Sequence, residues 1–237
     1  MKLRTRVVMQ LATLCFVLAA YGFAADEAYL YIVHGIPGRD TGSTLSPAFP
    51  IDVLINGETC IPRNLAYGTV SGPYSLLPGT YDVVISDANT LAPCTNPPIV
   101  TSQVTLAGGT SVSAVAEVSG GQPALVQFTD TLTPLGAGNA RFAFAQTADA
   151  GTLETTLLQL NVTKPKTFTV TASAGKQEAI TVPAGTYLVQ LYASGSTTVL
   201  ASETIILSNQ SATFAYAAGE SSNGSLGLFS KTVLGVF

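Results

Sequence analysis

The sequence has few of the residues that carry enzyme chemistry. It contains one histidine and no tryptophan, and charged residues make up only 10% of the chain, against about 25% in an average globular protein. Hydrophobic residues make up 47%, which is too high for a disordered chain. The remainder is rich in Thr, Ser and Gly, a composition typical of strands with one buried face and a neutral, hydroxyl-rich outer face. The composition therefore predicts an all-β protein.

Several motifs that would define a reaction or a cofactor are absent from the sequence. No Gly-x-Ser-x-Gly nucleophile elbow is present, and neither is a Gly-x-Gly-x-x-Gly turn or a lysine-bearing phosphate loop. No Asp-x-Asp-x-Asp loop for calcium occurs. We therefore expect no cofactor, no metal site and no enzymatic activity.

Residues 1–24 have the features of a secretory signal peptide. Three basic residues lie within the first six positions, an apolar run follows over 7–20, and the small residues Gly22 and Ala24 precede the expected cut. The alternative is an uncleaved membrane anchor, but the run is shorter than the roughly 20 residues that span a bilayer. We expect an exported protein, periplasmic, cell-surface or secreted, without stable membrane insertion after cleavage.

The charge balance excludes two classes of partner. Removal of three basic residues with the leader changes the net charge from −4 to −7, and no basic cluster remains. Binding to nucleic acid or to anionic lipid is therefore not expected.

Cys60 and Cys94 are the two cysteines that remain after the leader. In an oxidising compartment a disulfide between them is the expected state. It would close a loop of about 35 residues and stabilise the fold by roughly 3–4 kcal/mol. A metal site is the alternative, but it has no second cysteine pair to complete it.

The chain contains two similar segments, which predict a tandem duplication. The sequence "LLPGTYDVVISD" at 76–87 resembles "TVPAGTYLVQLYAS" at 181–194, and 101–116 resembles 202–217. In each copy a turn precedes alternating apolar residues, the pattern of a half-buried strand. We predict two domains, at 26–133 and 134–237, each an immunoglobulin-like antiparallel β-sandwich of about seven strands.

Three segments of the first copy resemble the family of domain of unknown function 4397. They are "VHGIP" (33–37), "FPIDVLINGE" (49–58) and "LAYGTVSGPYSLLPGTYDVVI" (65–85). The family's serine before proline is Ile36 here, and "GRDTGSTLS" is inserted after it. The resemblance implies secreted or cell-surface bacterial sandwich domains, often in tandem, and no established activity.

His34 is the only histidine, and two interpretations of it are open. It is either a hydrogen-bonding residue at a strand end, or part of a ligand or hydrolase site with Arg39, Asp40 and Asp52. Gln146 stands roughly at the equivalent position of the second copy, which favours the structural role. For Asp52 we favour an outward-facing residue or an acceptor that fixes the loop at 38–47 over a catalytic one.

These features are most consistent with a non-enzymatic binding, adhesion or structural module of the cell envelope or secreted fraction. Its partner is an unidentified protein or glycan. The alternative is a small-ligand or glycan binder, or a hydrolase, that uses the loop around His34 and Asp52. A platform of tyrosines for sugar rings is a further hypothesis, with Tyr29, Tyr31, Tyr67, Tyr74 and Tyr81 as its candidates.

Overall fold

A computed structural model describes residues 26–38, 49–221 and 224–234. The regular structure within these residues consists of sixteen β-strands. The all-β prediction is therefore confirmed, while the signal peptide at 1–24 lies outside the described residues. The described part of the chain contains no helix with the length and apolar character needed to cross a membrane.

The first eight strands form two four-stranded sheets with the orders β4-β1-β7-β8 and β3-β2-β5-β6. The first strand pairs in parallel with β7 and antiparallel with β4. The strands are β1 (Ala28–His34), β2 (Ile51–Ile55), β3 (Thr59–Cys60), β4 (Val70–Leu76), β5 (Gly79–Asp87), β6 (Pro98–Leu106), β7 (Ser111–Ser119) and β8 (Gln122–Asp130).

The last eight strands form two more sheets, with the orders β12-β9-β15-β16 and β11-β10-β13-β14. Counted from its own first strand, this half repeats the strand order of the first half, including the parallel pair, here β9 with β15. The strands are β9 (Asn139–Asp149), β10 (Leu153–Gln159), β11 (Thr167–Ala172), β12 (Lys176–Pro183), β13 (Gly185–Ala193), β14 (Val199–Leu207), β15 (Ala212–Glu220) and β16 (Gly227–Val233).

The Gly-Thr-Tyr segments begin equivalent strands, β5 and β13. In both, the tyrosine hydroxyl donates to a carbonyl four residues earlier: Tyr81 to Leu77 at 2.7 Å and Tyr187 to Pro183 at 2.7 Å. Each bond ties the start of a strand to the turn before it. Tyr81 and Tyr187 therefore have the same local role in the two halves.

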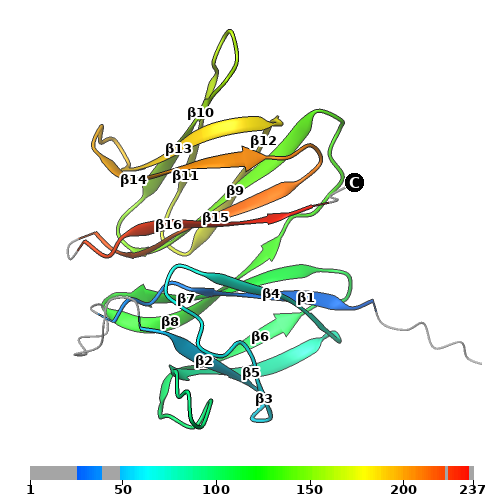
Figure 1. Cartoon of the computed structure of the whole chain (residues 1–237), viewed down its shortest axis with the longest axis vertical. Helices are drawn as coiled ribbons and strands as arrows, with labels where there is room; N and C mark the ends of the chain where they lie inside the picture. Colours follow the sequence, from blue (N-terminus) through cyan, green and yellow to red (C-terminus); the bar gives the residue numbers. More distant parts are fainter. Residues whose placement is uncertain (1–25, 39–48, 222–223, 235–237) are drawn as a thin grey trace, which may run out of the picture.

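The four sheets are stacked face to face in one column (Figure 1). The two middle sheets are those that contain β7 and β9, and these strands contact each other across the boundary between the halves. All residues of β7 except the last are buried, and all of β9 except its two end residues. The expectation of strands with one wet face is thus wrong for the middle of the stack, because both faces of these strands are covered.

Three apolar clusters follow from this stacking. One lies inside each half, between its two sheets. The third lies between the halves and includes Val33 and Val115 of the first with Ala145, Phe214 and Tyr216 of the second. Burial of these side chains at the boundary joins the two halves into one packed body.

Two details differ from the immunoglobulin arrangement that the sequence suggested. Each half contains eight strands rather than about seven. The first strand lies between the fourth and the seventh, whereas the seven-stranded immunoglobulin sheets have the orders ABED and CFG. The sandwich class is confirmed, but the strand order is not that of an immunoglobulin domain.

A short linker, residues 131–138, joins β8 to β9. The guanidinium group of Arg141 donates to the carbonyls of Thr131 and Thr133 at 2.9 and 3.1 Å, so the linker is held against the second half. At the other end of the boundary Gly35 packs against the second half. A Cβ atom at Gly35 would lie 2.6 Å from Cβ of Ala218 and 2.8 Å from the carbonyl oxygen of Ala116.

Replacement of Gly35 by alanine is expected to destabilise the protein by about 1–3 kcal/mol, because the added methyl group requires the halves to separate. Chemical denaturation of the purified variant measures this free energy. Gly151→Ala is the control, since a Cβ atom there meets nothing within 4 Å. Equal destabilisation of both variants would contradict the close contact at Gly35.

Candidate functional site

His34 ends β1 and is fully buried. Its Nε2 lies 2.9 Å from the carbonyl oxygen of Phe49, and its Nδ1 lies 3.3 Å from the amide nitrogen of Ile36. A carbonyl only accepts and an amide only donates, so the ring is neutral with its proton on Nε2. Burial lowers the pKa of His34 to about 4, although the bond to Phe49 opposes this change. Both ring nitrogens are therefore used in fixing the backbone.

Gln146 has the same hydrogen-bonding role in the second half. His34 pairs with Ala116 in the first parallel ladder and Gln146 with Ala217 in the second, at equivalent positions. The Gln146 side chain accepts from the amide of Ala148, two residues on, at 3.0 Å, and donates to the carbonyl of Gly151 at 2.8 Å. An amide side chain thus reproduces both bonds of the imidazole.

Asp52 lies in β2 and is 1% exposed. Its Oδ1 accepts from the amide of Asn64 at 2.9 Å, and its Oδ2 accepts from the amides of Asn89 and Cys94, each at 3.0 Å. Burial raises the pKa of Asp52, but these three bonds and the charge of Arg63 outweigh it, so the pKa is lowered. The carboxylate fixes the loops around Asn64 and Asn89, rather than facing outward.

The structure does not bring His34 and Asp52 into one site. A hollow of about 300 Å³ lies beside Asp52, lined also by Arg63, Asn64 and Asn89, and His34 is not part of it. Arg39 and Asp40, the other two candidates, lie outside the described residues.

Cys60 and Cys94 form the expected disulfide, which is confirmed with a Cα–Cα distance of 6.0 Å. One oxygen of Asp52 and the two sulfurs lie within 4.8 Å of one another. The sulfurs are bonded to each other, so they offer no thiolate to a metal ion. The disulfide and Asp52 together hold the loop at 88–94 against β2 and β3.

A buried polar cluster that the sequence did not indicate lies at the boundary between the halves. The Lys231 ammonium of β16 donates to Asp130 Oδ2 at 2.8 Å and to Ser113 Oγ at 2.7 Å. It also lies 3.3 Å from the centre of the Tyr31 ring. Tyr216 Oη lies 2.7 Å from Ser113 Oγ. Hydrogen bonds and an ion pair thus cross from one half to the other.

Burial determines the electrostatics of this cluster. The side chains of Lys231 and Asp130 are 7% and 0% exposed. Burial lowers the pKa of Lys231 to about 8, although the charge of Asp130 opposes this. Burial and the charge of Asp130 raise the pKa of Tyr216 well above its usual value, so this tyrosine remains a neutral hydroxyl. Each buried charge has the partner it requires.

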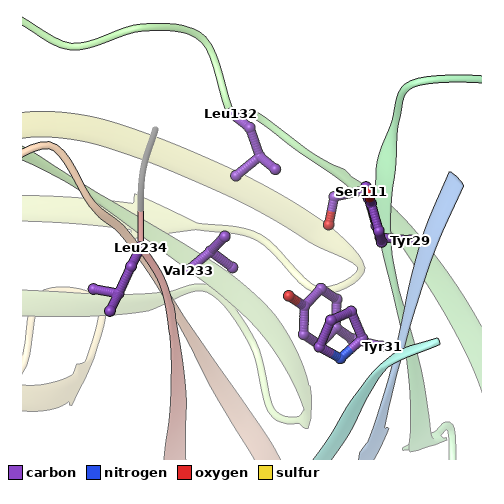
Figure 2. Close-up of a pocket in the computed structure, with 7 residues that line it drawn as sticks. Tyr29, Tyr31, Ser111, Leu132, Val233 and Leu234 are labelled. Atoms are coloured by element: carbon purple, nitrogen blue, oxygen red, sulfur yellow. The ribbon is translucent and has the colours of Figure 1, made fainter. Parts of the chain in front are cut away.

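A hollow of about 400 Å³ opens next to this cluster. Figure 2 shows Tyr31 on one side of it and Val233 and Leu234 on the other, with Leu132 of the linker above them. The lining is Tyr29, Tyr31, Pro73, Ser111, Leu132, Val233 and Leu234. Both halves and the linker therefore contribute to this hollow, which is the candidate functional site.

The sequence contained only indirect signals of this site. Of the five tyrosines considered as a platform, Tyr29 and Tyr31 line the hollow. The hydroxyl of Tyr67 instead donates to the carbonyl of Ser225, and its ring packs edge-on against His34. Asp130 and Lys231 are separated by 101 residues, so no local pattern relates them. The local signal was Lys231 itself, a charged residue among the apolar side chains of β16.

The sequence model of a family described as "Domain of unknown function (DUF4397)" matches residues 28–156. The chain belongs to the DUF4397 family. The match covers all eight strands of the first half, β9 and the start of β10. The later strands of the second half lie outside the matched region. A search of curated proteins found no match.

Two solved structures are distantly similar to this DUF4397 chain. The Bacillus anthracis TIE protein is 11% identical over 82% of the chain, with a TM-score of 0.24. The chain spans about a third of that protein's length, 32%. A candidate cell adhesion protein from Bacteroides ovatus is 10% identical, with 88% of the chain and 96% of that protein covered and a TM-score of 0.25. Neither likeness shows a common fold.

Replacement of His34 by glutamine, the residue of the second half, should keep the fold and change its pH dependence. The pKa of His34 is about 4 in the folded protein and about 6.5 when unfolded. Between these values only the unfolded state binds the proton, so wild-type stability falls as the pH falls. Relative to His34→Gln, the wild type should lose about 3 kcal/mol from pH 7 to pH 4. Parallel urea titrations measure this difference, and superimposable pH profiles would refute it.

Replacement of Lys231 by methionine leaves Asp130 buried without its cation, so unfolding should become easier by about 3–5 kcal/mol. The double variant Lys231→Met/Asp130→Asn should recover most of this loss, because the amide carries no charge. Lys176→Met, on the exposed end of β12, is the control. A Lys231→Met protein as stable as this control would show that the ion pair does not hold the boundary.

Proposed function

We propose that the protein is an exported, non-enzymatic binding module, and that its partner is a protein that inserts an apolar side chain into the hollow between the two halves. The observation that carries this proposal is the hollow itself. Six of its seven lining residues present aromatic, aliphatic or proline surface, and the seventh is Ser111.

A non-enzymatic role is supported by the way the candidate catalytic groups are used. Both ring nitrogens of His34 and both oxygens of Asp52 are engaged with backbone groups. A general base needs a free acceptor atom within reach of its substrate. Neither residue lines the hollow between the halves.

Export is supported by two features. The disulfide between Cys60 and Cys94 is a bond that persists in oxidising compartments. The first 24 residues have the charge and hydropathy pattern of a leader. The location that fits both is the periplasm, the cell surface or the secreted fraction.

A protein partner fits the lining better than a glycan. Sugars present many hydroxyl groups and require several polar side chains around them, whereas a protein anchor is an aromatic or aliphatic side chain in a pocket. Tyr29 is 43% exposed and Leu234 is 72% exposed, so apolar surface remains open to a partner at this hollow. The Ser111 hydroxyl already donates to Asp130 at 2.8 Å.

We also infer that the two halves descend from one duplicated unit. The common strand order, the matching tyrosines Tyr81 and Tyr187, and the equivalent roles of His34 and Gln146 support this origin. The hollow has no counterpart within one unit, because residues from both halves line it. Binding at this place would thus be a property of the pair.

The test is selection of peptides from a displayed random library on the chain from residue 25 onward. Enriched peptides should share an aromatic or aliphatic anchor. Their affinity should fall at least about tenfold on the variant Tyr29→Ala/Leu234→Ala, as for an anchor residue. The control is Leu91→Ala/Ile206→Ala, whose residues are 95% and 68% exposed and lie outside the hollow.

Two outcomes would overturn the proposal. Binding of a glycan from an array, lost in Tyr29→Ala/Leu234→Ala, would replace the protein partner by a sugar. Turnover of an ester or glycoside panel, lost in His34→Gln while the fold is kept, would show an enzyme.

A further inference from the structure

Glu117 is a buried carboxylate that has no partner in the described part of the chain. It lies near the end of β7 and is 8% exposed. It shares a face of that strand with Ser113 and Val115, both of which contact the second half. No hydrogen bond or ion pair reaches its oxygens from any described residue. Its oxygens still reach solvent, so water or a cation can satisfy them.

A second carboxylate faces the same space from the other half. Asp149 ends β9, and its Oδ2 accepts from the amide of Gly121 of the first half at 2.8 Å. This hydrogen bond of Asp149 therefore crosses the boundary at the end opposite to Lys231. Burial and the charge of Asp149 raise the pKa of Glu117 to about 7, as expected for two acidic groups with no cation near them.

The two carboxylates line a cavity of about 130 Å³ between the halves. A water molecule occupies about 30 Å³ in the liquid, so the cavity has room for a cation and a few waters. Its other lining residues are Val118, Ser119, Ala148, Ala174 and Gly175. Ser119 contributes a hydroxyl group, and no histidine or cysteine side chain is among them.

We propose that this cavity binds a calcium ion, with Glu117 of the first half and Asp149 of the second half as its carboxylate ligands. Calcium takes six to eight oxygen ligands, including carbonyls and waters, in adaptable geometry, whereas magnesium requires a strict octahedron. Oxygen-only donors also exclude the metals that prefer nitrogen or sulfur. This site is separate from the hollow of the proposed function and does not depend on it.

A calcium ion here would compensate buried negative charge, as Lys231 does elsewhere on the boundary. At one end of the boundary Lys231 compensates the buried charge of Asp130 across the two halves. At the other end Glu117 and Asp149 have no such cation within the described residues. A bound calcium ion would supply it there and join the halves.

The test is thermal unfolding of the chain from residue 25 onward, first treated with a chelator, at pH 8 with and without calcium. We expect a dissociation constant on the order of 10⁻⁴–10⁻³ M, as in extracellular calcium modules. Calcium at about 10 mM should therefore raise the midpoint of unfolding by several degrees. Glu117→Gln and Asp149→Asn should each remove this rise, while Glu178→Gln, at an exposed position of β12, should retain it.

Three results would overturn the inference. They are no rise in the wild type, an equal rise in Glu117→Gln, and an equal rise with magnesium at the same concentration. Glu117→Gln removes a buried charge, so the variant is expected to fold, and its unfolding midpoint without calcium verifies this. No partner is present in the experiment, so failure here leaves the proposed function untouched.

Discussion

The structure depends on the burial of two sheets on both faces. Each middle sheet packs against its own half on one side and against the other half on the opposite side, so neighbouring positions along β7, β9 and β15 are all removed from water. Alanine is frequent in these strands, with two in β7 and four each in β9 and β15, among larger buried residues such as Phe142 and Phe214. The same constraint requires that each polar group in the middle layers have a partner.

The two ends of this boundary meet that requirement differently. At the Lys231 end the carboxylate, ammonium and hydroxyl groups satisfy one another, and the hollow opens beside them. At the Glu117 end the charges are of one sign. His34 satisfies backbone groups of Phe49 and Ile36, and Gln146 satisfies that of Ala148. Polar side chains here set how the halves meet, while apolar area provides most of the attraction.

Much of the fold could be predicted from local patterns. The composition predicted strands, the repeated Gly-Thr-Tyr segments marked equivalent strand starts, and export predicted the bond between Cys60 and Cys94. The sheet order could not be predicted, because the pairing of β1 with β7 joins residues about 80 positions apart. The candidate site could not be predicted from the sequence either, since Lys231 and Asp130 meet only when two complete sandwiches are stacked. His34 attracted attention as a rare residue, but rarity does not distinguish a ligand from a strand end.

The short linker has a consequence for how this chain acquires its structure. The segment 131–138 keeps the halves within a few residues of each other, so each meets the other at an effective concentration in the millimolar range or above. The face of the first half that carries Tyr31, Val33 and Asp130 is covered only by the second half. During synthesis the part of that face around Asp130 and Tyr31 lacks Lys231 until β16 is complete. Docking of the second half onto this face then competes with aggregation through it. The two sandwiches therefore behave as one cooperative unit rather than as interchangeable modules.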